Sequence, residues 1–125
     1  MPKNNSPTIL LAEDDQFLQR MYSTKLRQQG MKVITASDGE KAVSLIQKHK
    51  PDIILLDILM PKKDGFVVLE EIKSDSKIKL IPVILLTNLS EVDDIKRARK
   101  LGADDYLIKS HFLPSEVIEV LRKYL

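Results

Sequence analysis

The chain contains no cysteine, so it can form no disulfide, and this favours a reducing compartment. It also has no apolar run near the roughly 18 residues that a membrane span requires. The first seven residues, MPKNNSP, are polar and lack the apolar centre of a secretion signal. We therefore expect a cytoplasmic globular protein in which residues 1–7 form a flexible tail.

An excess of charge of one sign is absent as well. The 20 basic and 18 acidic residues leave a formal net charge of +2, which is not the balance of a nucleic-acid polycation. The basic run KRARK at 96–100 follows the acids Glu91, Asp93 and Asp94, so a solvated or partner-facing helix side is the better interpretation. We expect no direct contact with nucleic acid or membrane.

Internal repeats and low-complexity segments are also lacking, and 125 residues suit a single domain spanning 1–125. Short apolar runs alternate with amphipathic segments. Runs that are apolar on both faces predict strands buried between helix layers. These strands are expected at residues 9–12, 32–36, 53–56, 81–86 and 106–108.

The amphipathic segments between these runs predict five helices. They are expected from about 17 to 26 with Gly30 ending the turn, from the capping-box pattern at 37–40 to 49, over 66–73, from Ser90 to before Gly102, and from Pro114 onward. Fivefold alternation of strand and helix predicts an α/β domain with a parallel sheet and helices on both faces.

Acidic side chains stand where two of the strongest strands end. Glu13 and Asp14 follow the first strand, in ILLAEDD, and Asp57 follows the third. Parallel strands place their carboxyl ends on one edge, where ligands bind. Two like charges about 4 Å apart repel by about 4 kcal/mol at an effective dielectric of 20. A hard cation with oxygen ligands, Mg²⁺ above all, would offset that repulsion.

The fourth and fifth strands end in a hydroxyl and an amine. Thr87 closes PVILLT and Lys109 closes DYLIK, so both are expected at the edge that carries the acids. A carboxylate can act as a nucleophile, while an ammonium and a hydroxyl can hold phosphoryl oxygens. The pattern favours phosphoryl transfer to an aspartate.

The segments ILLAEDD, PDIILLDILMPKKDG, PVILLTN and GADDYLIK, with a closing amphipathic helix, cover nearly the whole chain. In this order and spacing the sequence resembles a bacterial two-component response regulator receiver domain, similar to the single-domain chemotaxis regulators. The resemblance implies a flavodoxin-like (βα)5 fold, a doubly wound parallel five-stranded sheet with strand order 2-1-3-4-5.

The resemblance also implies a role for each site residue. Asp57 would be the phosphoacceptor, and Lys109 would contact the phosphoryl group. Thr87 would bond a phosphoryl oxygen and move, with Tyr106 turning inward as it does. The Mg²⁺ ligands would be Asp14, Asp57, Glu13 through water, and the backbone carbonyl of Leu59.

By the same resemblance the chain is a phosphorylation-controlled signalling module and not an enzyme, apart from its own phosphorylation and dephosphorylation. Its donor would be a sensor histidine kinase or a phosphotransfer protein. A downstream effector would bind the surface formed by the fourth helix, fifth strand and fifth helix, with the domain a monomer or a phosphorylation-dependent dimer.

Other functions remain as alternatives. The domain could be a degenerate receiver that acts as a constitutive protein-binding adaptor, although the intact acids, Thr87 and Lys109 argue against it. An aspartate-nucleophile phosphatase usually has a second acid where Leu59 stands. A flavin carrier would need a hydroxyl- and glycine-rich loop in place of EDDQF. One departure from the family is Ser110, which stands where a proline with a cis bond is common.

Overall fold

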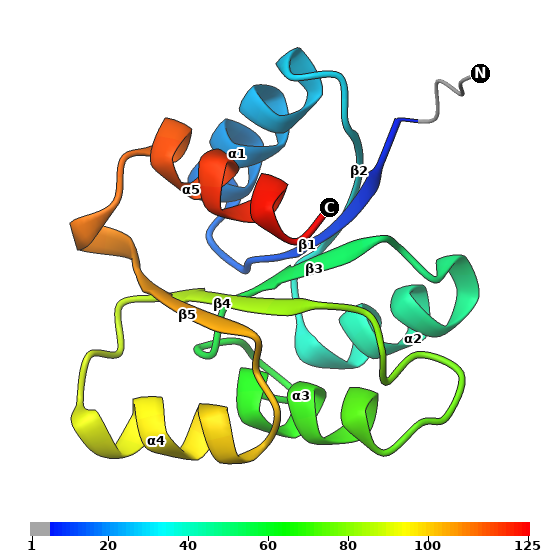
Figure 1. Ribbon diagram of the computed structural model, residues 1–125, viewed down its shortest axis with the longest axis vertical. Helices are drawn as coiled ribbons and strands as arrows, with labels where there is room; N and C mark the ends of the chain where they lie inside the picture. The colour runs from blue at the N-terminus through cyan, green and yellow to red at the C-terminus, as the bar shows by residue number, and fades with distance from the viewer. Residues whose placement is uncertain (1–5) are drawn as a thin grey trace.

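The computed structural model describes residues 6–125 as five strands and five α-helices in strict alternation, with one short 3₁₀ helix, η1 (Figure 1). Most of the predicted tail, residues 1–5, lies outside the described residues. Ser6 and Pro7 are described, and they precede the first strand without forming a helix or strand. The elements are β1 (Thr8–Ala12), α1 (Gln16–Gln28), β2 (Lys32–Ala36), α2 (Gly39–His49), β3 (Ile53–Leu56), α3 (Gly65–Lys73), β4 (Val83–Thr87), α4 (Val92–Lys100), β5 (Asp105–Ile108), η1 (Lys109–His111) and α5 (Pro114–Lys123).

All five strands are parallel, in the order β2-β1-β3-β4-β5. The expected fold class and strand order are confirmed. The central strands β3 and β4 are buried at every residue, whereas the edge strands β2 and β5 are only partly covered. This is why the central runs are apolar on both faces, since each face meets a layer of helices.

Two helix layers enclose the sheet. Figure 1 shows α1 and α5 on one face and α2, α3 and α4 on the other. The apolar core is divided accordingly. Ile9 and Leu11 of β1 pack with α1 and α5, while Leu10 and Ala12 pack toward the opposite layer. Alternate residues of one strand therefore supply both cores.

Three helices begin at an aspartate whose side chain accepts a hydrogen bond from the first turn. Asp15 caps α1, Asp38 caps α2 and Asp64 caps α3. The capping-box prediction at 37–40 is wrong in detail, because Asp38 and not Ser37 is the cap. The Asp38 side chain accepts the hydrogen bond from the Lys41 N–H. Serine and aspartate can both cap a helix, so the sequence pattern alone does not choose between Ser37 and Asp38.

The start of β4 also differs from expectation. β4 starts at Val83 rather than at residue 81, because Pro82 has no N–H and the Val83 N–H donates to the Asp104 carboxylate. Residues 6–125 contain no cis peptide bond, so the Lys109–Ser110 bond is trans, and η1 carries the chain from β5 toward α5. In the same range, no helix is both long enough and apolar enough to cross a membrane.

Candidate functional site

Three carboxylates meet at the carboxyl edge of the sheet. Glu13 and Asp14 follow β1, Asp57 follows β3, and one oxygen of each lies within 4.8 Å of the others. Glu13 and Asp57 are buried, at 3% and 6% exposed, whereas Asp14 is open to solvent. The strands position them, because the Asp57 N–H donates to the Ala12 carbonyl and so joins the two strand ends.

Lys109 is the cation of this cluster. Its Nζ lies 2.7 Å from Asp57 Oδ2 and 2.5 Å from Glu13 Oε1, and its side chain is only 10% exposed. The remaining carboxylate oxygens are partly satisfied by backbone. The Leu59 N–H donates to Asp57 Oδ1, and the Asp15 N–H donates to Glu13 Oε2.

The cluster is short of positive charge. Burial raises the pKa of the Glu13 carboxyl above its ordinary value, and the hydrogen bonds from Lys109 and the Asp15 amide offset only part of that rise. Burial alone would lower the pKa of Lys109, but its hydrogen bonds to Asp57 and Glu13 outweigh burial and raise it. One ammonium therefore faces three carboxyl groups.

This donor set fits Mg²⁺. Magnesium takes oxygen ligands and usually keeps several waters alongside one or two carboxylates, and the exposed Asp14 leaves room for them. The backbone carbonyl of Leu59, the predicted fourth ligand, accepts no hydrogen bond within residues 6–125 and remains available. The roles of these residues as ligands remain predictions.

Thr87 and Tyr106 lie on the neighbouring strands. Thr87 ends β4, is fully buried, and its Oγ1 accepts the Leu89 N–H at 3.4 Å. The Tyr106 hydroxyl, on β5, donates to the Leu89 carbonyl at 2.7 Å. Burial, with the charges of Asp94 and Asp57, raises the pKa of Tyr106 to about 12. Both side chains thus contact the segment between β4 and α4.

Gln19 of α1 was not predicted as part of the site. Its Nε2 donates to the Glu13 carbonyl at 2.8 Å, and also to Ser37 Oγ at 3.1 Å. It thereby fixes the backbone that carries Glu13. A glutamine in an amphipathic helix is usually solvated, so no signal in the sequence distinguishes this one.

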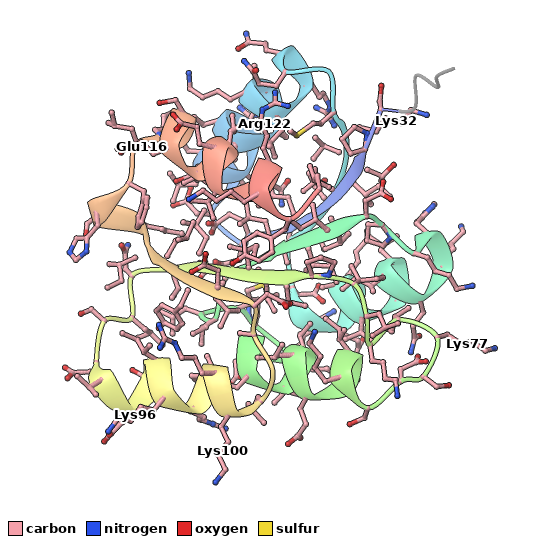
Figure 2. All side chains as sticks on the ribbon, viewed as in Figure 1. Lys32, Lys77, Lys96, Lys100, Glu116 and Arg122 are labelled. Carbon is pink, nitrogen blue, oxygen red and sulfur yellow. The ribbon has the colours of Figure 1, made fainter. Side chains whose placement is uncertain are left out.

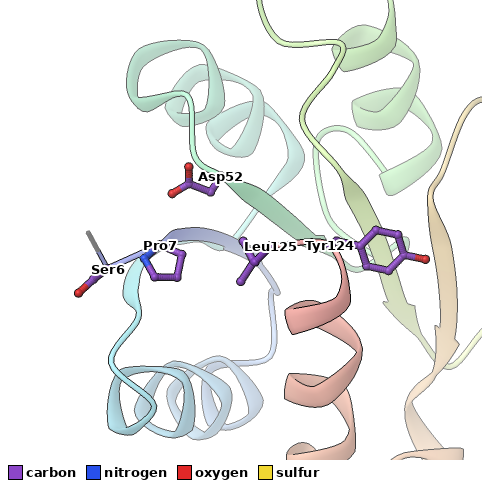
Figure 3. A pocket seen from close by; sticks show the side chains of 5 residues that line it. All are labelled: Ser6, Pro7, Asp52, Tyr124 and Leu125. Carbon is purple, nitrogen blue, oxygen red and sulfur yellow. The ribbon is translucent and has the colours of Figure 1, made fainter. Parts of the chain in front are cut away.

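A hollow also lies elsewhere in the molecule. About 420 Å³ in volume, it is lined by Ser6, Pro7, Asp52, Tyr124 and Leu125 (Figure 3). These residues precede β1 and β3 or end α5, so the hollow opens at the amino edge of the sheet. The carboxylates lie at the opposite edge, and it is their chemistry, not cavity size, that marks the candidate site.

The α4 surface carries the basic run. Figure 2 shows Lys96 and Lys100 projecting away from the sheet. The Arg97 guanidinium stacks over the Phe66 ring of α3, 4.1 Å from its centre. Of the run KRARK, only Ala98 is buried. Glu116 and Arg122 are exposed on α5, which covers the other face of the sheet (Figure 2).

Comparison with known families gives a clear match. The family model described as "Response regulator receiver domain" matches residues 9–122. The chain belongs to this family. Response regulator receiver domains act in two-component signalling, where they interact with histidine kinases and effectors. The predicted resemblance is confirmed, and the carboxylate cluster of this receiver domain is consistent with the Mg²⁺ that the family typically uses.

Curated relatives are longer than this receiver domain. "Probable transcriptional regulator ycf27" of Guillardia theta is 41% identical over 117 residues, which is 94% of this chain and 44% of that protein. "Transcriptional regulatory protein PdtaR" of Mycobacterium tuberculosis is 35% identical, covering 91% of this chain and 57% of that protein. The chain spans about half the length of these relatives.

Solved structures share the whole receiver fold. Chemotaxis protein CheY4 of Vibrio cholerae has a TM-score of 0.90 and 28% identity, over 97% of this chain and all of that one. The receiver domain of Francisella response regulator 1452 has a TM-score of 0.87 and 31% identity, over 95% of this chain and 96% of that one.

Proposed function

We propose that this receiver domain accepts a phosphoryl group on Asp57 from a phosphohistidine of a sensor kinase or phosphotransfer protein, in a Mg²⁺-dependent step. One observation carries the proposal. The buried Asp57 carboxylate lies 2.7 Å from the Lys109 ammonium and within 4.8 Å of the Glu13 and Asp14 carboxylates. A carboxylate able to act as a nucleophile, an ammonium able to hold phosphoryl oxygens and carboxylates of the kind that bind Mg²⁺ therefore share one edge.

In the proposed step a carboxylate oxygen of Asp57 attacks phosphorus, a phosphorus–oxygen bond forms, and the phosphorus–nitrogen bond of the donor breaks. The imidazole leaves with the bonding electron pair and takes up a proton. Lys109 turns from the carboxylates toward the transferred oxygens and stabilises their charge. Mg²⁺, held by Asp14, Asp57, the Leu59 carbonyl and Glu13 through water, would supply further charge neutralisation.

The proposed change at the effector-binding surface begins at Thr87. A hydroxyl drawn to the new phosphoryl oxygens would lose its bond from the Leu89 N–H, and Tyr106, which holds the Leu89 carbonyl, would then repack. The surface of α4, β5 and α5 would change with them. We propose that an effector protein binds this surface. We also propose that the surface does not contact nucleic acid or membrane directly.

The proposal excludes turnover of a separate substrate. Leu59 is 54% exposed and occupies the place where an aspartate-nucleophile phosphatase usually has its second acid. We therefore propose that the domain's chemistry is limited to gaining and losing its own phosphoryl group, in the cytoplasm.

The test is intact mass after incubation with acetyl phosphate, with and without Mg²⁺, for the wild type and Asp57→Asn. We expect one phosphoryl adduct that requires both Mg²⁺ and Asp57. No adduct under any condition would favour the degenerate, constitutive adaptor. An adduct that persists in Asp57→Asn would identify another nucleophile.

A further inference from the structure

The segment that follows Asp57 is held from outside the site by the first residue of α2. The Gly39 N–H donates to the Pro61 carbonyl at 3.2 Å. A Cβ placed on Gly39 would lie 1.9 Å from the Lys63 carbonyl oxygen and 2.7 Å from its carbon. The obstacle is backbone, which cannot rotate aside as a flexible side chain can. Gly39 is therefore required for space, because the loop packs directly on the helix end.

The same loop is tight on its other side. A Cβ on Gly65 would lie 2.6 Å from the Asp57 carbonyl oxygen, and the Gly65 N–H donates to the Ile58 carbonyl at 2.8 Å. Between these two glycines Lys62 has a left-handed φ of 70°, and its ammonium lies 3.8 Å from the Asp38 carboxylate. Residues 58–64 therefore pack tightly between the start of α2 and the end of β3.

The loop contributes the backbone amide and carbonyl of Leu59 to the candidate site. The Leu59 N–H donates to Asp57 Oδ1 at 3.2 Å, and the Leu59 carbonyl is the predicted backbone ligand of Mg²⁺. The position of both groups depends on where the loop rests. No side chain of α2 is among the grouped carboxylates or the partners of Lys109. The Gly39–Pro61 hydrogen bond and the close approach of Gly39 to Lys63 link the start of α2 directly to the loop that carries Leu59.

We propose that Gly39 is a positioning residue for the phosphoacceptor site: the end of α2 acts as a fixed stop that sets the place of Leu59 relative to Asp57. This inference rests on the proposed function, since it concerns the Mg²⁺ affinity of that same site. A methyl group at position 39 would push the loop, and with it the Leu59 amide and carbonyl, away from the carboxylates.

The experiment is a Mg²⁺ titration of the full chain followed by backbone amide NMR, for the wild type and Gly39→Ala. We expect the dissociation constant to rise roughly tenfold, the size typical when a group supporting a metal ligand is lost. We also expect amide shifts across residues 58–65 in the metal-free protein, which a general loss of stability would not produce selectively.

Gly30→Ala is the matched control. Gly30 has a φ of +84° and no atom within 4 Å of its would-be Cβ, so alanine there strains the backbone without touching the loop. It lies before β2, at the opposite edge of the sheet. We expect reduced stability and an unchanged Mg²⁺ affinity.

If Gly39→Ala does not fold, the Mg²⁺ affinity of Asp38→Ala tests the positioning role instead. This substitution removes the α2 cap and the partner of Lys62 without adding volume, and we expect weaker Mg²⁺ binding in the same direction. A wild-type dissociation constant in each folded variant would overturn the positioning role. A wild type that binds no Mg²⁺ would instead overturn the proposed function.

Discussion

Lys109 is the residue on which the charge balance of the site depends. It is the ammonium that neutralises part of a buried pair of acids, Glu13 and Asp57. A buried ion pair adds little net stability when both partners are present, because desolvation costs nearly as much as attraction returns. Removing one partner is different, since a buried charge then has no counterpart.

Lys109→Met is therefore expected to lower the free energy of unfolding of the metal-free protein by about 3 kcal/mol at neutral pH. The loss should shrink as pH falls, because a carboxyl with a raised folded-state pKa destabilises only above its unfolded value, near 4.5 for glutamate. Urea unfolding at pH 7 and pH 4 measures both quantities.

Lys63→Met is the control for this substitution. It removes a pair with Glu71 at 2.9 Å in which both side chains are about one-third exposed. Exposed pairs contribute less than about 1 kcal/mol, so the loss should be small and nearly independent of pH. An equal loss in the two variants would show that burial of the Lys109 cluster has no special energetic role.

The convergence of Glu13, Asp14, Asp57 and Lys109 could be predicted from sequence because it needs no fine geometry. Parallel strands bring their carboxyl ends to one edge, and a residue's place at a strand end then fixes its neighbourhood. Gln19 and Gly39 could not be found in this way. The Gln19 side chain bonds the Glu13 carbonyl, and Gly39 packs against the backbone of Lys63. No sequence pattern indicates that these segments lie next to each other.

At the scale of elements, α4 differs at its start from the three helices that precede it. Asp15, Asp38 and Asp64 cap α1, α2 and α3, but the Glu91 side chain makes no capping hydrogen bond. Ala98 is the one buried residue of α4. The helix thus has few buried contacts, which suits an element that would repack under the proposed mechanism.

Glu91→Ser is expected to raise the free energy of unfolding by about 0.5–1 kcal/mol, because serine can accept a first-turn N–H without adding charge near Asp93 and Asp94. Glu91→Ala removes the same carboxylate but cannot cap, and should give no such gain. Equilibrium urea unfolding compares the two, and equal stabilities would contradict the capping argument.

The strands were predictable because burial on both faces leaves an unbroken apolar run, as in IILL of β3. Helix starts were less so. Serine and aspartate both favour the N-cap position, and in α2 it is Asp38 that caps the helix. The cap of α4 was expected near Ser90, but the helix begins after Glu91. The type of each element can therefore be predicted from the sequence more accurately than the residue at which it begins.

For the whole molecule, the excess of acid at one edge couples folding to metal. Three carboxylates and one ammonium leave a site that a divalent cation would neutralise. A ligand that binds only the folded state stabilises it by mass action, by about 2.7 kcal/mol at 100 times its dissociation constant.

Mg²⁺ is therefore expected to raise the midpoint of thermal unfolding of the wild type and of Asp15→Asn, but not of Asp14→Asn. The two positions are adjacent and exposed, and differ in role. Asp15 caps α1 through Leu18, a task that asparagine also performs, whereas Asp14 belongs to the carboxylate cluster. Equal responses in the two variants would contradict the ligand assignment of Asp14.

The most direct test of the account is to locate the acyl phosphate. Protein treated with acetyl phosphate and Mg²⁺ is reduced with borohydride, which converts an aspartyl phosphate to homoserine, and is then digested and sequenced by mass spectrometry. We predict homoserine at position 57 and at no other aspartate, with none formed when Mg²⁺ is omitted. Homoserine at Asp14 or Asp15, or at no position in a folded protein, would contradict the central claim.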